Sequence, residues 1–126
     1  MFMKEKLFKT IVLDSGLTVN LYDASKKMNP DRWFVSFIIR MDIPVAETVL
    51  NKLEPSDPAR DDIARVLGPS ISFEQKIERV FIPDSQKEEL FHQFYDSFIT
   101  GSLGYFSHPS FAKNFIIKKY RELKRS

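Results

Sequence analysis

Between Trp33 and Val45 the chain reads WFVSFIIRMDIPV. Every odd position of this stretch is apolar, and residues two apart in a strand lie on the same face of a sheet. The even positions are mixed up to Ile38 and polar from Arg40 onward. The pattern predicts a long strand in the middle of a sheet, with both faces covered at its start and one face solvated at its end. Pro44 has no amide hydrogen to donate, so we expect strand pairing to stop near it.

Two alternating segments, 6–14 and 17–23, precede this strand. Gly16 lies between them and can adopt the positive φ that a hairpin turn needs. We therefore expect both segments to form an antiparallel meander with the strand at 32–45.

A fourth strand is predicted at 70–82, because apolar residues again alternate with polar ones. The charges on its polar side alternate in sign, which suits cross-strand pairing and protects an edge. Arg79 is the one charge on its apolar side. We expect Arg79 to lie near the open end of the sheet or to pair with a carboxylate such as Asp31 or Asp23.

Apolar residues at helical spacing predict helices near 58–67, 86–100 and 108–124, with a shorter one inside 46–54. Ser85 and Glu88 have the spacing of a capping box for the helix near 86–100. Residues 102–107 are expected to form a loop. The predicted fold class is α+β: an antiparallel four-stranded sheet, made of a β-meander and one later strand, packed on one face by about three helices.

The composition is typical of a single soluble domain covering residues 1–126, with 43% hydrophobic and 29% charged residues. The absence of cysteine excludes disulfides, thiolate nucleophiles and cysteine metal sites. The first residues mix Lys and Glu with apolar residues and do not resemble a signal peptide. The longest uncharged apolar run, 33–39, is too short to cross a bilayer. We therefore expect a cytoplasmic protein that does not associate with membranes.

Positive charge is concentrated at the C-terminal end of a chain whose net charge is +2. Residues 107–126 contain one acid, Glu122, and six basic residues: Lys113, Lys118, Lys119, Arg121, Lys124 and Arg125. Cations near the end of a helix interact favourably with its dipole, which is the simpler interpretation. The same charges also suit contact with phosphates or with an acidic partner.

No catalytic constellation is visible in the sequence. His92 and His108 have no partner at the spacing of metal ligands, and the four scattered glycines form neither a Walker loop nor a dinucleotide fingerprint. We therefore expect no metal and no cofactor. An enzyme that uses Asp23, Asp31 and His108 is the least favoured hypothesis on function.

The segment 23–32 is the best candidate for a ligand site, because its cations lie beside carboxylates and next to the only Trp. Cations near an exposed aromatic ring can hold an anionic or planar ligand by charge and stacking. The candidate ligand-binding residues are Asp23, Ser25, Lys26, Lys27, Asp31, Arg32, Trp33, Arg79 and His108. The alternative is that the polar residues shape a turn and pair locally while Trp33 fills the core.

Several of these residues belong to motifs spread along the chain. The motifs are Asp23-Ala24-Ser25, Asp31-Arg32-Trp33-x-Val35, Glu78-Arg79-x-Phe81-Ile82 and Tyr105-Phe106-x-His108-Pro109-x-Phe111. Their succession resembles small uncharacterised bacterial proteins of a domain-of-unknown-function type. The resemblance implies no activity. It suggests that the segment 23–32, Arg79 and the turn at His108 belong to one feature.

The leading hypothesis on function, a non-enzymatic binding or interaction module, follows from the absence of catalytic groups, and the aromatic residues suggest a surface for it. Nine of the 17 lie between Phe91 and Tyr120, which is more than two helices on one sheet face need to bury. An exposed aromatic helical face would indicate a non-enzymatic binding or protein-interaction module of a bacterial cytoplasmic protein, acting as a homodimer or with a protein partner. A Phe-rich core is the preferred interpretation of these aromatic residues. The runner-up function is binding of an anionic small molecule or nucleic acid through residues 23–33.

Overall fold

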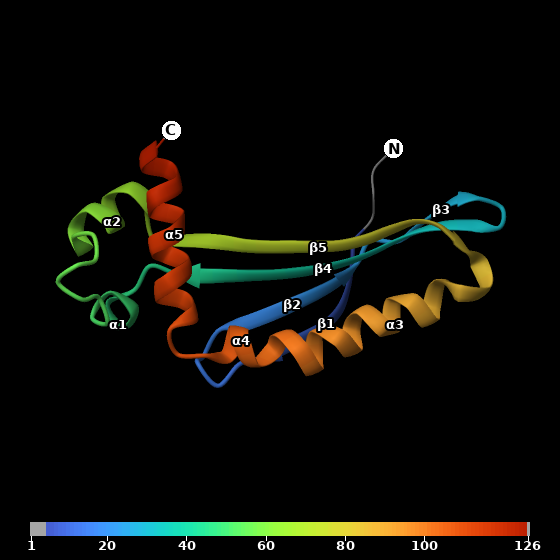
Figure 1. Cartoon of the computed structure of the whole chain (residues 1–126), viewed down its shortest axis with the longest axis horizontal. Coiled ribbons are helices and arrows are strands. Elements are labelled where there is room, and N and C mark those ends of the chain that lie inside the picture. Colours follow the sequence, from blue (N-terminus) through green and yellow to red (C-terminus); the bar gives the residue numbers. More distant parts are fainter. Residues whose placement is uncertain (1–4, 126) are drawn as a thin grey trace.

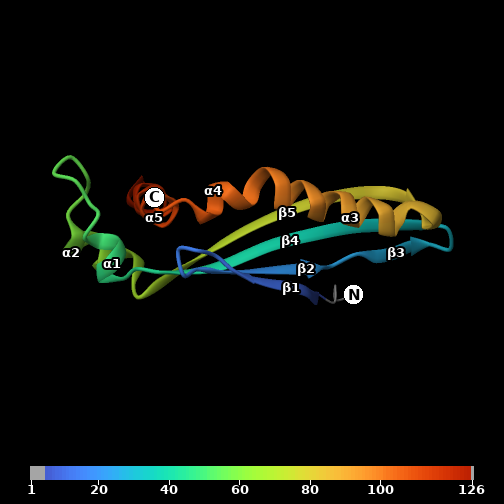
Figure 2. The same cartoon turned by 90° about the horizontal axis from the view of Figure 1, so that it is seen from below.

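An antiparallel sheet of five strands carries helices on one face only (Figures 1 and 2). This arrangement is seen in a computed structural model, which describes residues 5–125. The fold is α+β, as predicted, with a sheet that has one strand more than expected.

The predicted meander is confirmed by β1 (Lys6–Val12), β2 (Thr18–Asp23) and β4 (Arg32–Pro44), which pair in antiparallel order. The later strand, β5 (Ser70–Pro83), runs along the other edge of β4 from Pro44 back to Arg32. Pairing of β4 ends at Pro44, as its missing amide hydrogen requires.

The fifth strand, β3 (Lys26–Asn29), lies within the segment predicted to be a loop. It pairs with the first residues of β4, placing Lys26 opposite Phe34 and Lys27 opposite Trp33. Pairing of β2 with β4 reaches no further than Asp23 and Phe37, so the backbone groups at the start of β4 need another partner. The segment Lys26–Asn29 is that partner, and it bonds to β4 through its backbone. Its polar side chains follow no strand pattern, so the sequence did not predict this pairing.

Helices α3 (Lys87–Ser97) and α4 (Leu103–Ser107) run along the sheet, and α5 (Phe111–Arg125) crosses one end of it, beside α1 (Glu47–Leu50) and α2 (Arg60–Leu67) (Figures 1 and 2). A π-helical turn, Phe98–Ser102, joins α3 to α4, so residues 102–107 are helical and the predicted loop is wrong. The capping box is also wrong. A 3-10 turn, Asp84–Gln86, precedes α3, and no side chain caps that helix.

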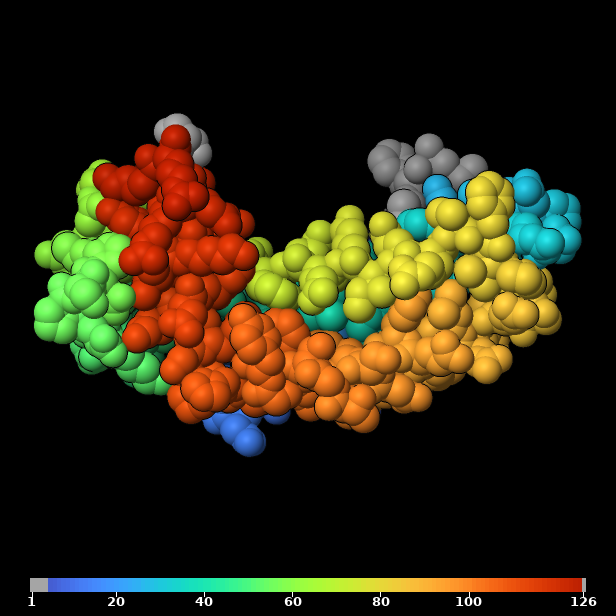
Figure 3. All heavy atoms as spheres, viewed as in Figure 1, coloured from blue at the N-terminus to red at the C-terminus, as the bar shows by residue number. Residues whose placement is uncertain are grey.

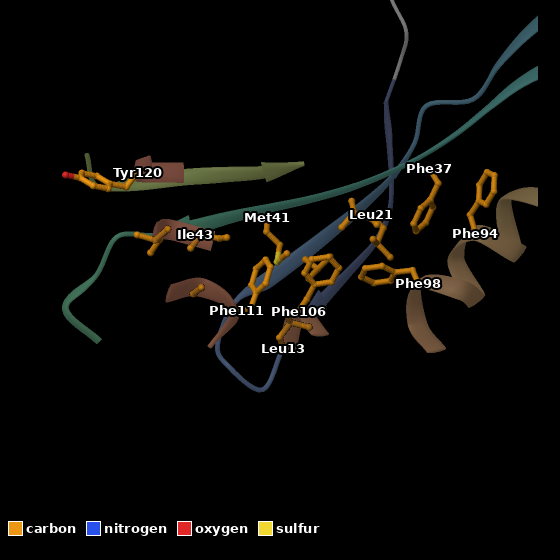
Figure 4. Packing of buried hydrophobic residues seen from close by; sticks show 14 of the residues in the cluster. Leu13, Leu21, Phe37, Met41, Ile43, Phe94, Phe98, Phe106, Phe111 and Tyr120 are labelled. Atoms are coloured by element: carbon orange, nitrogen blue, oxygen red, sulfur yellow. The ribbon is translucent and has the colours of Figure 1, made fainter. Parts of the chain in front are cut away.

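The core lies between the helices and the odd-numbered side chains of β4. Val35, Phe37, Ile39, Met41 and Ile43 are all at most 1% exposed. Figure 4 shows this row meeting aromatic rings from α3, α4 and α5, with Leu13 and Leu21 beside it. The sheet is thus held to the helices by one continuous apolar layer.

The opposite face of the sheet, called the open face below, has no helix over it (Figure 2). Ile38 is nevertheless 1% exposed there. Its cross-strand neighbours are Tyr22 and Lys76, and the guanidinium of Arg40 lies 4.9 Å from the centre of the Tyr22 ring. Long amphipathic side chains therefore cover this apolar residue while their polar ends remain in water.

The aromatic residues of the helices fill the core, as the preferred interpretation of a Phe-rich core predicted, and the described residues show no exposed aromatic helical face for a partner. Of the nine between Phe91 and Tyr120, all within the described range, six are buried, Tyr95 and Phe115 are half-buried, and Tyr105 is exposed. Within residues 5–125, no helix has the length and apolarity needed to cross a membrane.

Candidate functional site

Asp23 and Ser25 connect β2 and β3 to β4. The Asp23 carboxylate accepts a hydrogen bond from the Ser25 amide at 2.9 Å, and the Ser25 hydroxyl oxygen accepts one from the Ser36 amide at 3.0 Å. Ser36 in turn donates to Glu78 of β5 at 2.9 Å. These predicted ligand residues therefore shape the backbone where β2 gives way to β3.

Trp33 clamps the start of α3 to β4. Its Nε1 donates to Asp84 at 2.6 Å, and the ammonium of Lys87 lies 3.5 Å from the ring centre. Lys87 and Asp84 are also 3.7 Å apart, within ion-pair distance. One face of the ring is thus already covered by a cation of the same chain, where a stacked ligand was predicted.

Most of the cations predicted at this end have partners within the chain. Arg32 pairs with Asp31 at 3.0 Å, and the Lys26 ammonium lies 5.9 Å from the centre of the Phe34 ring. Arg79 lies 5.7 Å from the Phe94 ring and donates to a backbone carbonyl, so the carboxylate pairing expected for it is wrong. Lys27 is exposed, with no ion-pair partner among residues 5–125. The contacts favour the structural alternative for this segment.

His108 lies at the opposite end of the molecule. It lines a cavity with Pro44, the last residue of β4, whereas the segment 23–32 meets the first residues of that strand. The 13 residues of β4 extend over about 40 Å. Arg79, opposite Val35, lies at the same end of β4 as the segment 23–32. The expected grouping is therefore wrong for the His108 turn alone. The His108 ring has a turn role, since its Nδ1 accepts the Ser110 amide at 3.1 Å.

A β-bulge in β5 is a feature that the sequence analysis missed. Val80 and Phe81 lie opposite Phe34, between the regular pairs Val35–Arg79 and Trp33–Ile82. Phe81 has a φ of 59° and is 60% exposed, and Val80 is 55% exposed. The continuous apolar run from Val80 to Ile82 hides the bulge, because alternation cannot show which residue is the extra one.

The outer edge of β5 pairs with no other strand among residues 5–125. From Ile71 to Arg79 this edge is regular, with Ser72, Glu74, Lys76 and Glu78 on the open face. The other edge of the sheet is β1, which carries the exposed apolar residues Leu7 and Val12. That strand is shorter and is itself interrupted by a bulge at Phe8. The long regular edge of β5 is the larger surface for strand pairing.

An ion-pair network lies on the open face beside this edge. Arg40 binds Glu5 at 2.7 Å and Glu74 at 2.6 Å. The hydrogen bond from Arg40 lowers the pKa of Glu5, and the bonds to Glu5 and Glu74 raise the pKa of Arg40 against the effect of desolvation. Glu74 is also 3.7 Å from Lys76. The centre of the β5 edge therefore presents charges of both signs at fixed positions.

A second polar cluster joins α2 to α5. Asp62 of α2 accepts hydrogen bonds from the Tyr120 hydroxyl and from Arg65, and its carboxylate is 3.4 Å from Lys124. The Tyr120 bond, followed by the Arg65 bond, lowers the pKa of Asp62 to about 2, while the same bond raises the pKa of Tyr120.

Comparison with protein-family models, curated proteins and solved structures gave no match for this chain. Among residues 5–125, no group of three or more His, Asp or Glu side chains is arranged to hold a metal ion.

Proposed function

We propose that the protein is a non-enzymatic interaction module that self-associates by pairing the outer edge of β5 with the same edge of a second copy. The observation that carries the proposal is the self-complementary order of side chains along that edge. Free edge strands present unpaired backbone donors and acceptors, and pairing with another chain satisfies them.

A two-fold axis at Gln75 gives the best antiparallel register. It places Glu74 opposite Lys76 of the second copy, and Lys76 opposite Glu74 of the second copy. On the helix-covered face it places Phe73 opposite Ile77 of the second copy. Opposite charges and apolar pairs directly across two strands are both stabilising.

The bulge supports the same register. The regular stretch Ile71–Arg79 is centred on Gln75. Each end of the paired stretch therefore stops at a bulge, that of one copy at one end and that of the second copy at the other. An axis one residue later would place Lys76 opposite its own copy and Glu74 opposite Glu78, and like charges across strands are destabilising. An axis two residues later would place Phe73 opposite Phe81 of the second copy, within the bulge, where regular pairing is interrupted.

The surroundings of the edge fit a second copy. Figure 3 shows the surface hollowed along β5, between α5 and the end of the sheet that carries β3. Antiparallel pairing brings the start of one β5, where α5 crosses the sheet, next to the end of the other β5, where α3 begins (Figure 1). The basic last turn of α5 then approaches the acidic first turn of the other α3. The exposed Val80 and Phe81 would be covered at the same junction.

The test uses two single variants, Glu74→Lys and Lys76→Glu, and light scattering after size exclusion. We expect the natural chain, of 14.7 kDa, to elute as a dimer. Each variant alone should be monomeric, because it places like charges opposite each other. An equimolar mixture of the two variants should form a heterodimer, because every charge at positions 74 and 76 again faces an opposite charge.

Val12→Glu is the matched control, since it adds a charge to the exposed β1 edge and leaves β5 unchanged. It should remain dimeric, and circular dichroism should show that all variants are folded. A monomeric natural chain would overturn the proposal. So would a dimer that both β5 variants leave intact, or a mixture that stays monomeric.

A further inference from the structure

A cavity of about 260 Å³ lies at the end of β4 that is remote from β3. Four segments meet around it: the β1–β2 turn, the last residue of β4, helix α1 with the residues after it, and the turn between α4 and α5. The cavity is separate from the β5 edge. An inference drawn from it is thus independent of the proposed function.

The polar side chains of the cavity include three that can donate hydrogen bonds near the His108 turn. The Lys52 ammonium donates to the Pro109 carbonyl at 3.3 Å, which holds its charge beside the His108 turn. Because His108 Nδ1 accepts the Ser110 amide, the neutral ring carries its proton on Nε2 and can donate there. Thr48 adds a hydroxyl group to the lining.

The described lining contains no carboxylate. In contrast, Asp57 lines two neighbouring surface grooves, together with Glu122 in one and Glu54 in the other. Both grooves also contain cations, Lys118, Arg121 and Arg125 in one and Arg60 in the other, so their charges are mixed. Lys52, in contrast, meets no carboxylate in the lining of this cavity. A lining that contains an ammonium group and an imidazole N–H but no carboxylate favours a negatively charged ligand.

The rest of the lining is apolar, with Leu17, Val49 and Ala112 among its members. At about 260 Å³ the cavity lies just below the common range of ligand pockets, about 300–1,000 Å³, which favours a small ligand. Small-ligand sites commonly combine such an apolar wall with a few convergent polar groups. We infer that the cavity binds a small monocarboxylate, with its carboxylate at Lys52 and His108 and a short hydrocarbon tail against the apolar wall.

The test titrates the full-length chain with butyrate, hexanoate, butyramide and inorganic phosphate, and follows amide shifts by ¹⁵N NMR. We expect the two carboxylates to shift the amides of Gly16, Val49 and Ala112, with hexanoate binding more tightly than butyrate because of its longer tail. Butyramide has the same shape as butyrate without the charge and should not bind. Phosphate should bind more weakly than butyrate, because it leaves the apolar wall empty.

Lys52→Met should weaken hexanoate binding at least tenfold, and His108→Gln should weaken it to a smaller extent. Lys118→Met is the matched control, because it removes the same charge from α5 outside the cavity. It should leave the affinity unchanged. The inference is overturned if no carboxylate shifts these amides, if butyramide or phosphate binds as tightly as butyrate, or if Lys52→Met and Lys118→Met have equal effects.

Discussion

Phe81 is held in a conformation that its side chain disfavours. At its φ of 59° the Cβ crowds the neighbouring carbonyl, which costs a residue other than glycine about 1–2 kcal/mol. Its ring is 60% exposed, so burial within one chain does not offset the cost. Strain that persists at an exposed aromatic residue is typical of a position retained for contact with another molecule.

Two substitutions separate the strain from the loss of the ring. Phe81→Gly and Phe81→Ala both remove the ring, but only glycine removes the Cβ. We expect Phe81→Gly to be more stable than Phe81→Ala by about 1 kcal/mol, measured by urea unfolding of the monomeric Lys76→Glu background. Equal stability of the two variants, or a more stable alanine variant, would show that the left-handed backbone at this residue carries no strain.

At the scale of elements, Asp62 fastens α2 to α5 and makes their contact dependent on pH. Its pKa is lowered to about 2 from an ordinary value of 3.8, so the folded state favours the charged carboxylate. The stability it contributes is fully present above about pH 4 and is lost as the pH falls toward 2. The pKa of Tyr120 is raised, so its contribution is lost only as the pH rises above 10.

Asp62→Asn should therefore lower the melting temperature by a few degrees at neutral pH, and the difference from the natural chain should close between pH 4 and pH 2. Asp61→Asn, which alters the neighbouring acid of the same helix turn, is the control and should give a smaller difference with no such closure. A difference for Asp62→Asn that stays constant down to pH 2 would contradict the assignment of this pKa shift to the helix contact.

Side-chain periodicity predicted those elements whose two faces differ in polarity. Alternation placed β4 and β5 almost to the residue, because each has one face against the core and another toward water. It could not predict β3, which is exposed along its whole length and is held by backbone hydrogen bonds. It also missed the bulge at Phe81, because three consecutive apolar residues fit either register.

The sequence could not show which candidate site residues lie close together, because the chemistry of a side chain carries no information about distances in the fold. The strand that connects Arg32 to Pro44 keeps the Trp33 end and the His108 end apart. Trp33 seemed free to stack on a ligand because its partners, Asp84 and Lys87, come from a turn and a helix far away in sequence. Conversely, no motif in the sequence marks Lys52 as a site residue. Its position becomes apparent only in the fold, where it donates to the Pro109 carbonyl beside His108.

For the whole molecule, pairing through β5 would link stability to protein concentration. Two chains that unfold from a dimer gain stability by mass action, about 1.4 kcal/mol for each tenfold rise in concentration. The melting temperature of the natural chain should therefore rise by roughly 2–4 °C per tenfold increase in concentration. Lys76→Glu should melt at a temperature that does not depend on concentration, while Val12→Glu should follow the natural chain. A natural chain whose melting temperature is constant over a hundredfold range would show that each copy is stable alone and that the β5 edge stays open in solution.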